Sequence, residues 1–193
     1  MSQAPPAADG NRRAELVRVS ARLFRERGFD GTTVRDIAQA AGMRSGSPFY
    51  HFKTKHDILA AVMEAGLTAG LPAAEAIATG SLAPRAKFRA LLRAHLELVL
   101  GEGHDFIPVM LYDWRCLTPE LRARVQRLRD RYDQLWQDVV RELAAAGLLK
   151  SDSAVARLLL TGAVNYTVLW YKAGQGWDLD QVADEAVTMF LRG

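Results

Sequence analysis

Apolar side chains recur at the spacing of an α-helix along almost the whole chain of 193 residues, and no stretch alternates apolar and polar residues as a β-strand does. Nearly half of the residues (49%) are apolar, which is enough to build a core. Prolines and glycines fall mostly between the helical stretches. The chain is therefore predicted to be all-α, with helices at 11–28, 34–40, 46–52, 55–79, 83–100, 105–115, 119–146, 152–172 and 179–192.

Charge divides the chain into a basic first quarter and a nearly neutral remainder. Residues 1–55 carry 10 Lys and Arg against 5 Asp and Glu, a net charge of +5, and residues 56–193 carry 15 against 17, a net charge of −2. A basic segment of this kind favours a head that binds a polyanion, although a solvated basic helix face gives the same charge. We expect a disordered tail at 1–10, a head at 11–54 and a larger helical bundle at 55–193.

The segment between residues 33 and 52 has the pattern of two short helices joined by a tight turn. Thr33 and Asp36 have the spacing of a capping box, which begins a helix. Gly42 permits the left-handed backbone of a turn. Ser45 is expected to cap the next helix, with Pro48 as its third residue, where the missing N–H costs no helix bond. Together these features indicate a helix-turn-helix, which places its second helix in the major groove of DNA.

Short polar and bulky side chains near the start of that second helix are suited to reach base edges. Arg44 is expected either to read a guanine or to hold a phosphate. His51, Lys55 and Thr33 are expected to contact phosphates, and Phe52 to lie in the core. The predicted DNA contacts are Thr33, Arg44, Ser45, Ser47, Pro48, Phe49, Tyr50, His51 and Lys55.

The stretch GFDGTTVRDIAQAAGMRSGSPFYHFKTKHDIL, residues 28–59, resembles the DNA-binding segment of the TetR family of bacterial transcription regulators. The likeness includes the aromatic residue after Gly28, the Ala-Gly turn and the Tyr-His-Phe ending. It implies a three-helix head on a ligand-binding and dimerisation domain. The operator contacts that it implies are Ser45, Ser47, Phe49, Tyr50, His51 and Lys55. Two residues depart from the family pattern: Phe49 stands where tyrosine is usual, and Pro48 where a larger aliphatic residue is usual.

The stretch 154–171 is apolar nearly all round, so it must be covered on every side. A membrane span is one interpretation, but Arg157, Thr161 and Asn165 argue against it. If a second copy of the chain covers this stretch and the last helix, the chain forms a homodimer with two-fold symmetry. The two symmetric heads are then expected to read a palindromic operator. The predicted interface residues are Val155, Leu159, Val164, Tyr171, Val182, Ala186, Met189 and Phe190.

The middle of the bundle is rich in aromatic residues, and the family resemblance implies a ligand cavity there. Simple core packing is the alternative for each of these residues. His95 and Arg115 are candidates to pair with a carboxylate or phosphate of the ligand. The predicted ligand-binding residues are His95, Val99, Phe106, Met110, Trp114, Arg115, Tyr132, Trp136, Tyr166 and Trp170. The ending around Trp170-Tyr171-Lys172 also resembles TetR-type repressors of fatty-acid and sterol catabolism, a group that responds to acyl-CoA thioesters.

These observations predict a ligand-responsive repressor whose partners are double-stranded operator DNA, a second copy of the chain and a small apolar or aromatic effector. A DNA-binding regulator controlled by a protein partner, without a small ligand, is the alternative. The sequence has no glycine-rich phosphate loop, no metal-ligand spacing among its four histidines and no nucleophile elbow, so we expect no enzyme, no cofactor and no metal. A single cysteine, Cys116, is typical of a cytoplasmic protein, and no membrane partner is expected.

Overall fold

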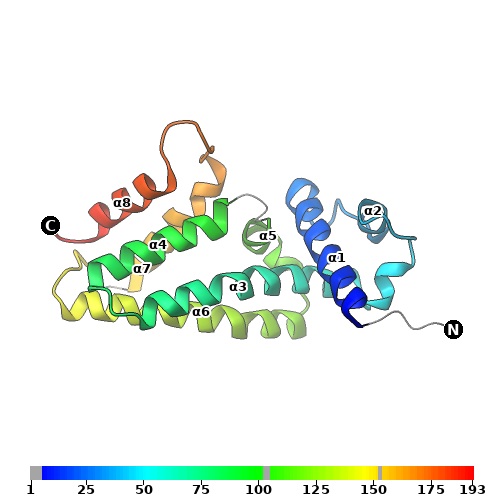
Figure 1. The fold of residues 1–193 in the computed structure, drawn as a ribbon, viewed down its shortest axis with the longest axis horizontal. Helices are drawn as coiled ribbons and strands as arrows, with labels where there is room; N and C mark the ends of the chain where they lie inside the picture. Colours follow the sequence, from blue (N-terminus) through cyan, green and yellow to red (C-terminus); the bar gives the residue numbers. More distant parts are fainter. Residues whose placement is uncertain (1–5, 102–104, 152–153) are drawn as a thin grey trace. The chain divides into compact units, whose positions relative to one another are not determined.

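The computed structural model describes residues 6–101, 105–151 and 154–193, and among these residues it contains helices and no strand (Figure 1). This confirms the all-α prediction. The α-helices are α1 (Pro6–Arg27), α2 (Val34–Ala40), α3 (Lys55–Thr79), α4 (Pro84–Leu100), α5 (Phe106–Asp113), α6 (Pro119–Ala145), α7 (Ala154–Tyr166) and α8 (Leu179–Phe190). The 3-10 turns are η1 (Ser47–Tyr50), η2 (Trp114–Cys116) and η3 (Thr167–Leu169).

Most helix bounds agree with the predicted ones, and the differences are local. α1 begins at Pro6, so residues 6–10, which were expected in a disordered tail, are helical, while 1–5 lie outside the described residues. Proline is well tolerated in a first helical turn, where its missing N–H has no helix partner. The predicted helices 105–115 and 152–172 each end in a 3-10 turn, which apolar periodicity does not distinguish from an α-helix.

The chain folds into two compact units. The head unit contains residues up to Gly66 together with Asp105–Arg127, and the body unit contains Leu67–His104 and Leu128–Gly193. The division differs from the predicted boundary at residue 55, because α3 and α6 each belong partly to both units and α5 packs against α1.

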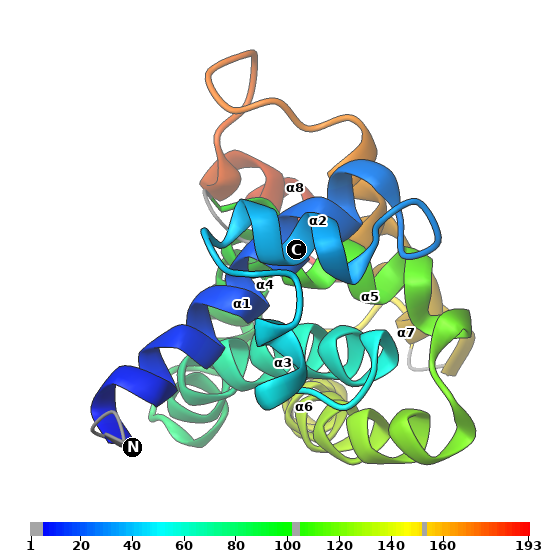
Figure 2. The ribbon, with the colours of Figure 1, turned by 90° about the vertical axis from the view of Figure 1, so that its right-hand side faces the viewer.

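The core of the head unit is formed by the apolar faces of α1, α2 and the start of α3. Leu16, Phe24 and Ile37 are fully buried, and Phe52 is buried after η1 as predicted. In Figure 2, α2 and the segment that leads to α3 follow α1 at the front of the view.

The body unit is organised around α4, which packs against α8 and α7. Its buried face carries Phe88, Leu91 and Leu92. α3 is long and apolar enough to cross a membrane by length and composition, but 61% of its most apolar stretch is buried inside the protein, as in the core helix of a folded domain.

Candidate functional site

The corner between α1 and α2 is fixed by short-range bonds. Gly28 has a φ of +72° and its N–H donates to the Phe24 carbonyl at 2.8 Å, which ends α1. Thr32 is fully buried, and its hydroxyl lies 2.9 Å from the Gly28 carbonyl and 3.2 Å from the Leu23 carbonyl. These bonds set the direction in which α2 leaves the corner.

The predicted capping box at the start of α2 is confirmed. The Asp36 N–H donates to Thr33 Oγ1 at 3.1 Å, and the Thr33 N–H and hydroxyl donate to Asp36 Oδ2 at 2.8 and 2.6 Å. The hydrogen bonds from Thr33 hold the pKa of Asp36 below its usual value. Because the Thr33 hydroxyl donates its proton to Asp36, it is not available to donate to a phosphate without breaking this box.

The turn after α2 is the left-handed glycine turn that the sequence predicts. Gly42 has a φ of +64°, its N–H donates to the Gln39 carbonyl at 3.1 Å, and the Met43 N–H donates to the Ala38 carbonyl at 2.8 Å. A side chain at Gly42 would be strained in this conformation.

The expected α-helix at 46–52 is instead the short 3-10 turn η1. Its N-cap is Gly46, so the predicted cap at Ser45 is wrong, and Pro48 is its second residue rather than its third. Pro48 lies in the first turn of η1, where its missing N–H has no helix partner.

The predicted DNA contacts differ in their exposure to solvent. Tyr50 is 90% exposed and Phe49 55% exposed, and Arg44 and Ser45 are also exposed. Ser47 and His51 are half-buried. Pro48 is buried, so its ring has no path to a base edge, and its place among the predicted contacts is not supported.

Lys55 is half-buried and does not point its ammonium into solvent. Its Nζ donates to the Phe29 carbonyl at 2.9 Å and to the Thr32 carbonyl at 3.0 Å, and lies 4.0 Å from the centre of the Phe29 ring. The phosphate contact predicted for Lys55 does not match this geometry.

A second capping box precedes α3 and was missed in the sequence. The Asp57 N–H donates to Thr54 Oγ1 at 3.1 Å, and the Thr54 N–H donates to Asp57 Oδ2 at 2.9 Å. The spacing Thr-x-x-Asp is the same as that of Thr33 and Asp36, so the signal was present.

Three of the predicted ligand-binding residues come together inside the body unit. His95 Nδ1 lies 3.0 Å from the Tyr132 hydroxyl, its Nε2 lies 2.9 Å from Asn165 Oδ1, and the Trp136 ring meets the imidazole edge-on at 5.6 Å between centres. Burial lowers the pKa of His95 and raises that of Tyr132 to about 12, so both side chains are uncharged near neutral pH.

The other predicted ligand-binding residues are dispersed. Val99 is buried in the core of the body unit. Tyr166 and Trp170 are 61% and 45% exposed, so they do not line an enclosed cavity within this chain. The remaining four, which lie on α5 and η2 in the head unit, are Phe106, Met110, Trp114 and Arg115.

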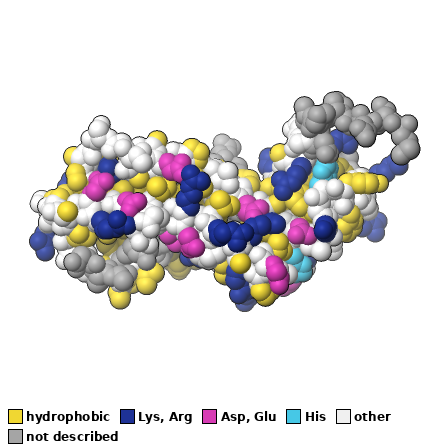
Figure 3. Space-filling view, turned by 90° about the horizontal axis from the view of Figure 1, so that it is seen from below, with side chains coloured by type: hydrophobic (Ala, Val, Ile, Leu, Met, Phe, Trp, Pro, Cys, Tyr) yellow, Lys and Arg dark blue, Asp and Glu magenta, His cyan; other side chains and the backbone are white. Residues whose placement is uncertain are grey.

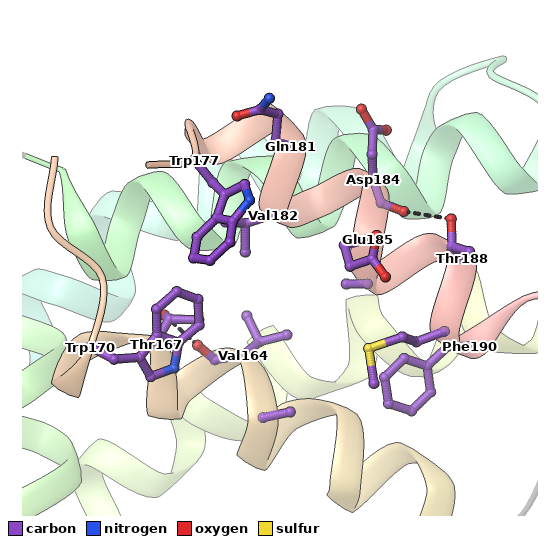
Figure 4. Close-up of a pocket in the computed structure, with 13 residues that line it drawn as sticks. Val164, Thr167, Trp170, Trp177, Gln181, Val182, Asp184, Glu185, Thr188 and Phe190 are labelled. Carbon is purple, nitrogen blue, oxygen red and sulfur yellow. Dashed lines mark hydrogen bonds between the residues drawn. The ribbon is translucent and has the colours of Figure 1, made fainter. Parts of the chain in front are cut away.

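An open apolar groove of about 650 Å³ lies in the body unit between α7, η3 and α8 (Figure 4). Trp170 and Trp177 lie toward one end of it and Phe190 toward the other. Trp177 was missed in the sequence because it stands alone in a loop. Five of the predicted dimer residues line this groove or its rim, namely Val164, Val182, Ala186, Met189 and Phe190.

Other predicted dimer residues also present apolar surface to solvent. Val155 and Leu159 on α7 are 62% and 64% exposed. Tyr171 is half-buried. Exposed apolar patches of this kind mark interaction sites.

Charged side chains fix α8 against α4. Arg89 binds Asp184 through two hydrogen bonds at 2.5 and 2.9 Å and Asp180 at 3.0 Å, and Arg93 binds Asp180 at 3.2 Å. Hydrogen bonds from these guanidinium groups lower the pKa of both aspartates.

Two arginines of α6 bind glutamates of α3. Arg124 binds Glu64 at 2.5 Å in the head unit, and Arg131 binds Glu75 in the body unit. On the face drawn in Figure 3, Lys and Arg side chains are interspersed with Asp and Glu. Among the described residues, no cluster of three or more His, Cys, Asp or Glu side chains is suited to hold a metal ion.

Two family models match the chain. Residues 16–62 match the model for bacterial regulatory proteins of the tetR family, and residues 81–193 match the tetracyclin repressor-like C-terminal domain.

Curated relatives and solved structures match over nearly the whole chain. The HTH-type transcriptional repressor KstR2 of Rhodococcus jostii is 31% identical over 98% of this chain and 96% of its own length. The structure of the superantigen PfiT is 39% identical with a TM-score of 0.79, covering 94% of this chain and 97% of that one. The structure of AibR in complex with isovaleryl coenzyme A and operator DNA is 24% identical with a TM-score of 0.83, covering 92% and 97%, and shows the likeness of fold.

Proposed function

Because the chain belongs to the TetR family of bacterial regulatory proteins, we propose that it is a transcription repressor that binds a palindromic operator as a homodimer and releases it when a small molecule binds. Family membership makes the chain a regulator and not an enzyme. The observation that carries the proposal is the exposure of Tyr50 and Phe49 on η1, which follows the left-handed turn at Gly42 in a basic head. A protein with this task works in the cytoplasm, where the DNA lies.

The head supplies two kinds of DNA contact. Its net charge of +5 over residues 1–55 attracts the phosphate backbone of any duplex. Arg44, Ser45 and the two exposed aromatic residues form the surface that reads bases, with Phe49 making apolar contact where the family usually has a tyrosine. The preference for particular DNA sequences therefore comes from η1 and from Arg44 and Ser45 before it.

The dimer covers the apolar surface of α7 and α8. Exposed Val155, Leu159 and Met189, together with the groove that Trp170 and Phe190 line, offer apolar surface for a second copy related by a two-fold axis. Two heads related in this way read two half-sites about 34 Å apart, one turn of the double helix.

The effector is an apolar molecule with an acyl or acyl-CoA character, bound in the body unit next to His95, Tyr132 and Trp136. These side chains combine aromatic surface with uncharged polar groups that already pair with one another and with Asn165, which suits the apolar part of a ligand. The AibR complex contains an acyl-CoA and operator DNA, which supports this class by analogy of fold. Effector and operator weaken each other's binding by the same factor, because they share one coupling free energy.

The likeness to the superantigen PfiT favours a second candidate, a protein of this fold whose target is another protein and not DNA. A regulator controlled by a protein partner, without a small ligand, is a third possibility that keeps the head and leaves the body unit without an effector. The exposed reading surface of the head favours a DNA target over the second candidate.

Selection of binding sites from a random pool of double-stranded DNA tests the proposal. We expect the purified protein to enrich a palindrome, and the variant Tyr50→Ala, which removes an exposed side chain, to enrich it weakly or not at all. Failure of the folded wild-type protein to enrich any sequence would contradict the proposed function. Screening acyl-CoA thioesters for a change in melting temperature then tests the effector class.

A further inference from the structure

Phe29, in the corner between α1 and α2, is held by two residues from later parts of the head unit. Its carbonyl accepts a hydrogen bond from Lys55 Nζ at 2.9 Å, and its ring lies 4.0 Å from the same nitrogen. Its backbone N–H donates to Asp113 Oδ1 at 3.4 Å. Lys55 comes from the start of α3 and Asp113 from the end of α5.

The three directions in which the Lys55 ammonium can donate are all occupied. Two N–H groups point to the carbonyls of Phe29 and Thr32, at 2.9 and 3.0 Å, and the aromatic face of Phe29 takes the third side. A phosphate contact requires this ammonium to leave two carbonyls of the corner. Thr32 is itself fully buried, so its carbonyl has few other partners.

Asp113 belongs to a helix that is tied to α1 and its corner at both ends. At the start of α5, Asp105 Oδ1 accepts a hydrogen bond from Arg25 of α1 at 2.7 Å, and at its end Asp113 accepts from Phe29. Burial raises the pKa of the Asp113 carboxyl. α5 lies within residues 81–193, the part that matches the C-terminal family model, so this contact joins the corner to a helix from that later part of the sequence.

We propose that Lys55 and Asp113 are positioning residues that fix the corner between α1 and α2 at Phe29, and that α5 thereby sets the position of α2 and of the turn carrying Phe49 and Tyr50. Lys55 acts inside the head and not on a DNA phosphate. The effect on operator binding rests on the proposed function, whereas the effect on the corner does not.

Amide hydrogen exchange without DNA tests the Lys55 contact. Lys55→Gln removes the ammonium, and Lys53→Gln removes the same charge from an exposed lysine two residues away. We expect exchange at residues 29–34 to rise about tenfold in Lys55→Gln and to stay unchanged in Lys53→Gln. Equal exchange in the two variants would overturn the proposal. If Lys55→Gln does not fold, Lys55→Arg replaces it, and faster exchange at the corner is still expected because a planar guanidinium does not fit between two carbonyls and a ring.

A second pair of variants tests Asp113. Asp113→Ala removes the acceptor of the Phe29 N–H, whereas Asp113→Asn keeps a carbonyl oxygen there. We expect faster exchange of the Phe29 amide in Asp113→Ala and recovery of most of the protection in Asp113→Asn. If the Phe29 amide exchanges in Asp113→Ala at the rate of the wild-type protein, Asp113 does not hold the corner and that part of the proposal is wrong.

The salt dependence of DNA binding separates positioning from phosphate contact. On the duplex enriched by selection, we expect Lys55→Gln to bind about tenfold more weakly than Lys53→Gln, with a slope of log affinity against log salt that is no shallower. A slope shallower by about 0.9 in Lys55→Gln alone would identify a phosphate contact and overturn the proposal. If the wild-type protein binds no DNA, the proposed function fails while the exchange experiments still decide the role of the two residues.

Discussion

The imidazole Nδ1 of His95 lies 3.0 Å from the hydroxyl oxygen of Tyr132, within the body unit. The opposite ring nitrogen faces Asn165 Oδ1 at 2.9 Å, so the proton of the neutral ring belongs on Nε2 and the tyrosine hydroxyl donates to Nδ1. This chain joins α4, α6 and α7 through groups that are uncharged near neutral pH. Among the residues that the structure describes, the tyrosine oxygen is the one acceptor within reach of the second N–H of a protonated His95.

Acid is therefore expected to destabilise the fold through His95. Burial places its pKa below 6.5 in the folded state, so below pH 6.5 the unfolded chain takes up a proton that the folded chain does not. The contribution of His95 to stability is complete above pH 6.5 and decreases as the pH falls, by at most about 1.4 kcal/mol per pH unit. Urea unfolding between pH 7.5 and 5.5 should show that the free energy of unfolding decreases less steeply with falling pH in His95→Gln than in the wild type. Parallel curves for the two proteins would contradict this account.

A buried ion pair in the body unit predicts an asymmetric response to mutation. Lys87, with its side chain only 6% exposed, donates to Glu142 at 2.9 Å and to the Ala78 carbonyl at 3.0 Å. Glu142→Ala leaves a buried charge without its counter-ion and is expected to cost about 1–3 kcal/mol, a range lowered because Glu142 is 40% exposed. The double variant with Lys87→Met removes that charge and is expected to recover most of the loss in urea unfolding. A double variant less stable than Glu142→Ala would rule out this explanation.

Two aromatic residues of the head are expected to respond in opposite ways. Tyr50 is 90% exposed, so Tyr50→Ala should change the free energy of unfolding by less than about 0.5 kcal/mol while weakening DNA binding. Phe52 is 5% exposed and lies under the Arg13 guanidinium at 4.9 Å, so Phe52→Ala should cost about 3–5 kcal/mol. Thermal unfolding and DNA affinity measured together check both. Wild-type affinity in a folded Tyr50→Ala would exclude that side chain from the reading surface.

The proposed dimer is tested by a charge placed on α7. Leu159 is 64% exposed in the single chain, and Leu159→Asp puts a carboxylate into the proposed interface, where an unpaired charge is strongly disfavoured. We expect light scattering to show a monomer for this variant and a dimer for the wild type. Leu82→Asp, at a residue 49% exposed before α4, is the matched control and should stay dimeric. A dimeric Leu159→Asp would place the interface elsewhere.

Features that depend on neighbours in sequence were predictable, and features that depend on distant residues were not. The Thr33–Asp36 box and the turn at Gly42 follow from spacings of a few residues, and both are confirmed. Lys55 contacts a carbonyl 26 residues earlier, so its basic character suggested a phosphate contact while its position in space gives it an internal one. Pro48 shows a further limit, since it lies in a 3-10 turn instead of the expected helix and is itself buried.

The body unit also has features that the sequence predicted and features that it did not. The apolar stretch of α7 predicted a face that needs a cover, and the exposure of Val155 and Leu159 agrees with that expectation. The predicted ligand-binding residues came from composition and family resemblance, which do not specify which side chains meet. His95, Tyr132 and Trp136 meet in the body unit, whereas Phe106 and Trp114 belong to the head unit because α5 packs against α1.

The affinity of the purified protein for its enriched palindrome, measured against a shuffled duplex of the same composition across a salt series, tests the central claim most directly. We predict that two copies of the chain bind each palindrome about a thousandfold or more tightly than the shuffled duplex. Equal affinity for the two duplexes, falling away together as salt rises, would contradict the repressor account.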